Sequence, residues 1–168
     1  MKFIKIIGLI LLFNILNVSQ IHAQWLEAQN PGIGQKAKDF TLKTLRAKKI
    51  NMTKFRAGKS AIIFFWATWC PHCRGQLVEL NVKRKEIETK GIKIILVDLG
   101  ESKEQVRSYI ERNKINLEVF LDEDESLSEE YQIEGVPTLV FIDQDGVTKA
   151  VKHYLPENYE KILEVAEN

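Results

Sequence analysis

The chain has 168 residues, which suggests one domain, and its 45% hydrophobic and 28% charged residues are ordinary for a globular protein with a substantial core. The net charge is +1, so nothing in the charge balance indicates a nucleic-acid partner. The two cysteines belong to one motif, which leaves no further pair to staple the fold, so stability must come from packing.

Residues 1–23 have the pattern of a secretory signal peptide. Two lysines precede an apolar run over residues 6–16, and Ala23 ends a sequence that suits cleavage. The run is short for a membrane span of ~17–25 residues, so we favour cleavage over an uncleaved anchor. We therefore expect an exported domain, residues 24–168, in the periplasm or cell envelope, where disulfides form and persist.

The sequence of the first half of this domain predicts short edge strands, then a buried strand followed by a helix. Residues 24–37 are expected to form an irregular arm, and alternating patterns at 40–42 and 50–52 predict a hairpin or short edge strands. Seven consecutive apolar residues, 61–67, predict a strand buried on both faces. The helix after this strand is expected over residues 71–90.

The middle of the chain continues the alternation. An apolar strand over residues 92–98 completes a right-handed parallel β-α-β unit. Capping-box patterns that start at Ser102 and Ser126 predict two further helices, with a short strand over 117–121 between them. The acidic residues 122–125 are interpreted as a solvated loop.

The last part of the chain predicts a hairpin and a helix. An apolar strand over 135–142 turns at 144–146 and returns over 147–154, a connection too short for a parallel crossover. Pro156 then opens a final helix. These elements together predict an α/β fold with a mixed central sheet flanked by helices.

The candidate site is the Cys-x-x-Cys motif between the buried strand and its helix. Cys70 is expected at the helix N-terminus, where unpaired N–H groups and the helix dipole favour a thiolate, and Cys73 lies one turn later. Cys70 would attack a disulfide and Cys73 would resolve the product, while His72 between them would stabilise the thiolate further. A structural disulfide and half of a zinc site are the alternatives to this redox interpretation.

Two segments of the sequence resemble thioredoxin, and the resemblance extends from about Gly34 to the C-terminus. The matching residues are Phe65-Trp-Ala-Thr-Trp-Cys-Pro-His-Cys73 and Gly135-Val-Pro-Thr138. The chain is most similar to the extracytoplasmic ResA/TlpA-like branch, on account of the signal peptide, the helix and strand inserted between Asp98 and Ser126, and the segments Asp39-Phe-Thr-Leu42, Val97-Asp-Leu-Gly-Glu-Ser-Lys103 and Phe120-Leu-Asp122.

The resemblance implies a thioredoxin fold with an N-terminal strand extension and a helix-strand insertion. It also implies that Pro137 is cis and packs against the disulfide, a choice that the residues alone leave open. The Val136 backbone, with Pro137, would bind a substrate segment, and Trp69 would border the reactive thiol in an active-site turn completed by Pro71 and His72. Members of this branch mostly reduce apocytochrome c cysteines with electrons from a membrane thiol carrier. We expect protein thiol or disulfide substrates, a monomer, and no cofactor.

Three departures from the family pattern leave questions open. Phe64 occupies the position of thioredoxin's buried Asp, and Gln76 stands where the branch often has a Glu, so the base for Cys73 is unassigned. Water or Glu79 would have to serve. The Pro71-His72 dipeptide is that of the strong oxidant DsbA, which makes an oxidant or isomerase of exported proteins the alternative function.

A copper-binding module is a more remote alternative. Soft thiolates suit Cu(I), and His72 and His153 are the histidines available in the mature chain. However, copper-delivery relatives space their cysteines by three residues rather than two, so we expect no metal. A peroxidase is also disfavoured, because no separate peroxidatic cysteine is present.

Overall fold

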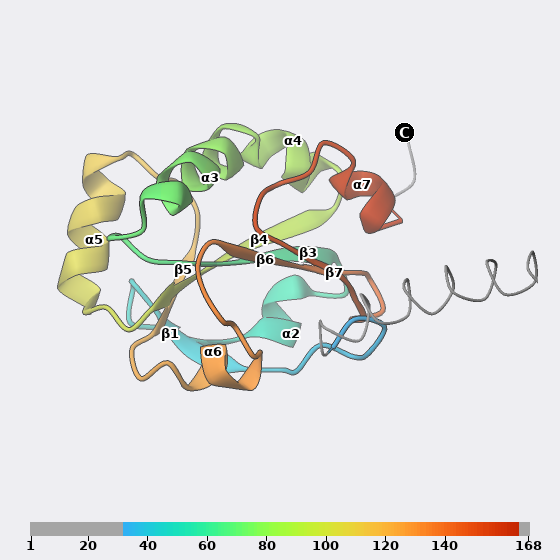
Figure 1. The fold of residues 1–168 in the computed structure, drawn as a ribbon, viewed down its shortest axis with the longest axis horizontal. Helices are drawn as coiled ribbons and strands as arrows, with labels where there is room; N and C mark the ends of the chain where they lie inside the picture. The colour runs from blue at the N-terminus through green and yellow to red at the C-terminus, as the bar shows by residue number, and fades with distance from the viewer. Residues whose placement is uncertain (1–31, 165–168) are drawn as a thin grey trace, which may run out of the picture. The chain divides into compact units, whose positions relative to one another are not determined.

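A computed structural model of the chain describes residues 32–164 (Figure 1). The predicted signal peptide, most of the predicted arm at 24–37 and the last four residues lie outside this part. None of the helices within it is long and apolar enough to span a bilayer.

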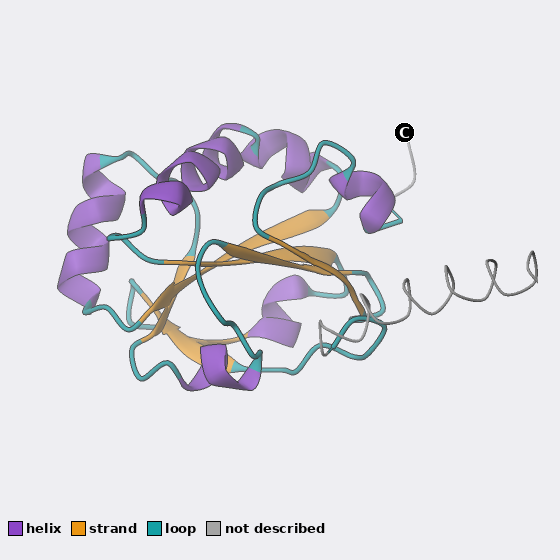
Figure 2. Ribbon diagram, in the orientation of Figure 1, coloured by secondary structure: helices purple, strands orange, loops and turns teal. Residues whose placement is uncertain are grey.

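The centre of the fold is one mixed seven-stranded sheet in the order β2-β1-β5-β4-β3-β6-β7. The strands are drawn in orange in Figure 2. Strands β3, β4 and β5 are parallel, and the other pairs are antiparallel. The α/β prediction is therefore confirmed. The strands are β1 (Thr41–Thr44), β2 (Lys49–Asn51), β3 (Ser60–Trp66), β4 (Ile92–Leu99), β5 (Val119–Asp122), β6 (Thr138–Ile142) and β7 (Thr148–Lys152).

Helices cover both faces of this sheet (Figure 1). They are α2 (Met52–Arg56), α3 (Pro71–Val82), α4 (Arg84–Thr89), α5 (Lys103–Arg112), α6 (Ser126–Glu130) and α7 (Tyr159–Ile162). Buried side chains of α3, α4, α5 and α7 pack on one face, and those of α2 and α6 pack on the other. Every residue of β3 is buried, which accounts for its unbroken apolar sequence.

Alternation along β3 assigns its side chains to the two cores. Ile62, Phe64 and Trp66 face α3 and α5, whereas Ile63 and Phe65 face the opposite core. Each fully buried side chain of this size stabilises the fold by about 1.5–3 kcal/mol. The strand is thus a rigid support, and the turn that begins the site follows directly from its end.

The helix α5 begins as its sequence predicts, but α6 does not. The hydroxyl of Ser102 accepts from the Gln105 N–H in a complete capping box. At α6 the residue before the helix is Glu125, whose φ is +58° and whose side chain does not cap the helix. Instead the Asp122 carboxylate accepts from the Leu127 and Ser128 N–H groups, so this acidic residue is buried rather than solvated, and the capping box predicted there is wrong.

Other element boundaries also differ from the predictions. Residues 52–56 form the short helix α2, capped by the Asn51 side chain, where a strand end was expected. The long helix bends at Lys83 into α3 and α4, although the backbone hydrogen bonds on both sides of the bend persist. The final helix begins at Tyr159 rather than at Pro156.

Candidate functional site

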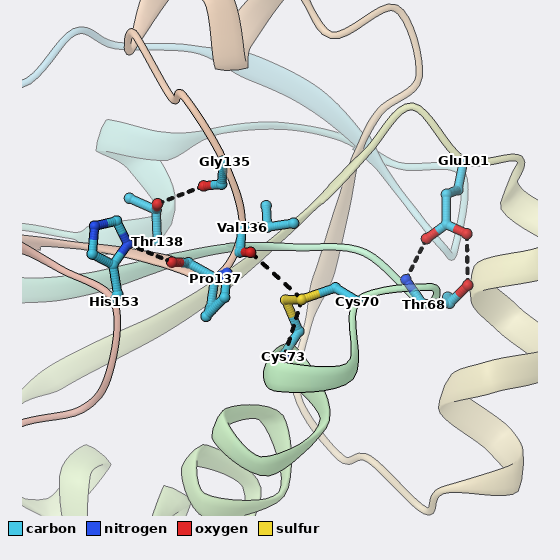
Figure 3. The surroundings of a disulfide bond; sticks show 9 residues. All are labelled: Thr68, Cys70, Cys73, Glu101, Gly135, Val136, Pro137, Thr138 and His153. Atoms are coloured by element: carbon cyan, nitrogen blue, oxygen red, sulfur yellow. Dashed lines mark hydrogen bonds between the residues drawn. A yellow bond between two sulfur atoms is a disulfide. The ribbon is translucent and has the colours of Figure 1, made fainter.

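The two cysteines form a disulfide that caps the N-terminus of α3 (Figure 3). Cys70 is the residue before the helix, and Pro71 occupies the first turn, where its missing N–H leaves nothing unsatisfied. The Cα atoms of Cys70 and Cys73 are 5.3 Å apart, and the Cys73 N–H points at the Cys70 sulfur, 3.1 Å away. Both cysteines are almost completely buried in this oxidised form.

The loop before β6 closes over the disulfide. The Val136–Pro137 peptide bond is cis, as the resemblance implies, and the carbonyl oxygen of Val136 lies 3.6 Å from the Cys70 sulfur (Figure 3). The same loop is tied internally by the Thr138 hydroxyl, which donates to the Gly135 carbonyl at 2.7 Å. The β3–β6 pairing positions this loop, because Phe65 at the end of β3 is aligned with Thr138.

His153 holds the other side of this loop, a contact that sequence analysis did not foresee. Its Nδ1 lies 2.8 Å from the Pro137 carbonyl oxygen (Figure 3). The antiparallel pairing of β6 and β7 brings the two residues together, since Leu139 is aligned with Lys152. His153 is therefore a neighbour of the candidate site, although it lies far from the cysteines in sequence.

The remaining predicted site residues face solvent. The Trp69 side chain is 66% exposed, beside the disulfide in the chain, and Pro71 and His72 are also exposed. The structure thus brings Val136 into contact with Cys70 of the Cys70–Cys73 disulfide and places exposed residues beside them.

Glu79, the side chain considered as a base for Cys73, is not free, and Gln76, which stands where the branch often has a Glu, is engaged as well. The Gln76 amide oxygen accepts from the Leu155 N–H at 2.6 Å, which ties α3 to the loop after β7. The Glu79 carboxylate is paired with Lys83, 2.9 Å away. Both side chains of this helix therefore have structural partners.

The turn between β3 and α3 has an anchor that sequence analysis missed. The Glu101 carboxylate accepts from the Thr68 N–H at 2.5 Å and from the Thr68 hydroxyl at 2.6 Å (Figure 3). Glu101 is only 6% exposed. The available signal was an acidic residue just after a buried strand, but its partner could not be identified without the fold.

A second buried acid lies beside Glu101. Asp98, near the end of β4, is fully buried, and neither of its carboxyl oxygens has a partner in full hydrogen-bond geometry among residues 32–164, although the Glu101 backbone N–H lies close enough to oppose the rise in its pKa. Burial raises the pKa of Asp98 to about 9, and the neighbouring Glu101 carboxylate adds to this increase. Asp98 is therefore a neutral acid at physiological pH.

No group of three or more His, Cys, Asp or Glu side chains with metal-ligand geometry occurs in residues 32–164. His72, one of the two histidines considered for copper, is exposed, and the other, His153, contacts the Pro137 carbonyl.

A disulfide at a helix N-terminus, beneath a cis-proline loop and at the end of a central strand, defines a thioredoxin-fold protein with the geometry for thiol–disulfide exchange. Comparison with known proteins gives the family. The AhpC/TSA family matches residues 33–151, and the chain belongs to this family.

Named relatives make the assignment more specific. The chain is 29% identical to the thiol-disulfide oxidoreductase ResA of Bacillus subtilis over 126 residues, which are 74% of this chain and 70% of that protein. It is 26% identical to ResA of Bacillus cereus over 160 residues, 95% of this chain and 91% of the relative. A thiol:disulfide interchange protein DsbE from Chlorobium tepidum has the same fold, with a TM-score of 0.69 at 22% identity over 79% of this chain and 93% of the other. The chain is thus similar in sequence to thiol–disulfide oxidoreductases of the ResA type.

Proposed function

We propose that the protein reduces disulfides in exported proteins through Cys70 and Cys73. The observation that carries this proposal is the disulfide at the start of α3, with the Cys73 N–H directed at the Cys70 sulfur. After reduction, the same N–H and the helix dipole would stabilise a Cys70 thiolate. The thiolate is the nucleophile of disulfide exchange.

The reaction needs only the two cysteines of this chain and a substrate disulfide. The Cys70 thiolate attacks one substrate sulfur, the substrate S–S bond breaks, and the other substrate sulfur leaves as a thiolate. Cys73 then gives its thiol proton to the departed substrate thiolate or to water and attacks the Cys70 sulfur of the mixed disulfide, which forms the Cys70–Cys73 bond and releases the second substrate thiolate. Two electrons pass to the substrate, and an external dithiol must return two electrons before the next cycle.

The loop at Val136 is the proposed docking edge for the substrate. An extended substrate segment could add to this backbone as a further strand, which would place its sulfur next to Cys70. Support comes from the 3.6 Å approach of the Val136 carbonyl oxygen to the Cys70 sulfur. Exposed Trp69 and Pro71 would then contact the same segment, with His72 at its edge.

Export, electron source and assembly are parts of the same proposal. The signal-peptide pattern of residues 1–23 supports a location in the periplasm or cell envelope for the domain of residues 24–168. Electrons would come from a membrane thiol carrier, and cysteines of apocytochrome c are the substrates that the resemblance suggests. A monomer suffices for this chemistry, because both cysteines come from one chain.

An oxidant of exported proteins is the second candidate. The Pro71-His72 dipeptide favours it, because a well-stabilised Cys70 thiolate makes the reduced form more stable and the disulfide more oxidising. His72 itself lies exposed in the first turn of α3, between the two cysteines.

Trapping of the mixed disulfide tests the proposed roles. The reduced Cys73→Ser variant, incubated with a disulfide-bonded protein substrate, should accumulate an adduct through Cys70, because no resolving thiol remains. The matched Cys70→Ser variant should accumulate far less, since Cys73 is completely buried. Equal trapping by the two variants, or none by either, would contradict the proposal.

A further inference from the structure

Asp98 and Glu101 form a buried pair of acids next to the turn that carries Cys70. Asp98 pairs in register with Trp66 of β3 and Leu121 of β5, so strands flank it on both sides. Alternation along β4 places its side chain on the same face as Leu96, which belongs to the core of both cysteines. The carboxyl group is therefore inside the core beneath the site.

Among residues 32–164, Glu101 is the charged group that acts on Asp98. Its register neighbours Trp66 and Leu121 carry no ionisable group, and on α5 the phenol of Tyr109 packs on the Trp66 ring with centroids 5.6 Å apart. Glu101 itself comes from the loop after β4.

Glu101 connects this pair to the site. Its carboxylate uses both oxygens to accept from Thr68, two residues before Cys70. Gly100, with φ of +67°, makes the reversal after β4 that brings Glu101 back to this turn, a conformation that favours glycine. The Glu101 contacts thus fix the backbone from which Cys70 extends.

Protonation of Asp98 matters because two adjacent buried carboxylates repel each other strongly. Among the described residues a charged Asp98 has no donor in full hydrogen-bond geometry, and the effect of the Glu101 backbone N–H is smaller than the opposing effects of burial and of the Glu101 carboxylate. A neutral Asp98 gains an O–H group, and the acceptor that faces this group is the Glu101 carboxylate. One proton between the two acids therefore satisfies both.

We propose that Asp98 is a positioning residue of the redox site, which as the neutral acid donates a hydrogen bond to Glu101 and thereby holds Glu101 on Thr68. When Asp98 loses its proton, repulsion between the two carboxylates displaces Glu101 and loosens the turn before Cys70. The proposal extends the proposed function and rests on it only for the importance of that turn.

The oxidised protein allows a direct test, because disulfide-bonded cysteines do not titrate. The ¹³C-methyl resonance of Thr68 can be followed by NMR from about pH 6 to about pH 10. The wild-type resonance should move through one transition near the pKa of Asp98, about 9, and the Asp98→Asn variant should show no such transition. As a matched control, Asp122→Asn, which alters another buried acid at the end of β5, should keep the transition.

A flat wild-type titration, or an unchanged transition in Asp98→Asn, would overturn the proposal. A second comparison separates hydrogen bonding from packing. Asparagine keeps an N–H donor for Glu101, whereas Asp98→Leu keeps the size without a donor. Dithiothreitol should therefore reduce the disulfide of Asp98→Asn at nearly the wild-type rate at neutral pH, and the rate for Asp98→Leu should change about fivefold, the effect of one hydrogen bond.

Equal rates for Asp98→Asn and Asp98→Leu would also count against the proposal. Failure of the proposed function looks different from these outcomes. If the protein does not exchange disulfides with protein substrates, the mixed-disulfide trapping fails, but the Thr68 titration in the oxidised protein is unaffected.

Discussion

Replacing Asp98 with asparagine should stabilise the protein, and by more as the pH rises. In the folded protein the pKa of Asp98 is raised to about 9, whereas an unfolded Asp has a pKa of about 3.9. Below about pH 4 the group is protonated in both states and has no effect on stability. As the pH rises from there to about 9, folding requires uptake of a proton, so the free energy of unfolding falls.

The size of this effect follows from the shift. Each pH unit in that window lowers the free energy of unfolding by about 1.4 kcal/mol. Near pH 7 the Asp98 carboxyl group therefore lowers the free energy of unfolding of the wild type by about 4 kcal/mol. The asparagine of the Asp98→Asn variant does not titrate and so makes no pH-dependent contribution to the free energy of unfolding. Its difference from wild type should therefore be small near pH 4 and grow with pH, above any constant offset from the amide hydrogen bond.

Urea unfolding of the oxidised protein at several pH values measures this difference as a shift in the midpoint at constant slope. The control is Asp122→Asn, whose carboxylate accepts from the Leu127 and Ser128 N–H groups. That variant should lose about 1–3 kcal/mol at neutral pH, because those donors lose a charged acceptor. A stability gain for Asp98→Asn that does not vary with pH would refute the reasoning.

Three further variants test other parts of the site. Gln76→Glu places a carboxylate one turn after Cys73, so resolution of the mixed disulfide in stopped-flow experiments should accelerate by about tenfold or more; an unchanged rate would mean that position 76 does not serve Cys73. His153→Ala removes the contact with the Pro137 carbonyl, and the KM for a protein substrate should rise about fivefold while the reduction potential stays constant; a changed potential with constant KM would contradict this assignment. Gly100→Ala should lose about 1–2 kcal/mol in thermal unfolding because φ is +67° there, and full stability would exclude this account of the loop.

The fold was predictable where local pattern and tertiary burial agree. The apolar run of β3 and the capping box at Ser102 each specify their element without help from distant residues. At Ser126 the same kind of pattern failed, because the Asp122 carboxylate, held in place by β5, reaches the helix start first. Burial of that carboxylate depends on the sheet, which local sequence does not encode.

The candidate site likewise has parts that the sequence predicts and parts that it does not. The Cys70–Cys73 pair follows from its motif, because the helix start sets its geometry within a few residues, whereas the cis bond before Pro137 was implied by the family resemblance and not by the residues alone. Glu101 lies 33 residues from its partner Thr68, so only the parallel arrangement of β3 and β4 reveals the contact. Asp98 ends an apolar strand and resembles a solvated strand end in sequence, yet packing of the neighbouring strands buries it completely.

The reduction potential of the Cys70–Cys73 pair, measured in glutathione buffers, tests the central claim most directly. A reductase requires a potential close to that of thioredoxin, about −270 mV, so that the reduced form readily gives electrons to substrate disulfides. We expect a value in that region. A value near that of DsbA, about −120 mV, would contradict the reductase and would assign the protein to the oxidation of exported substrates.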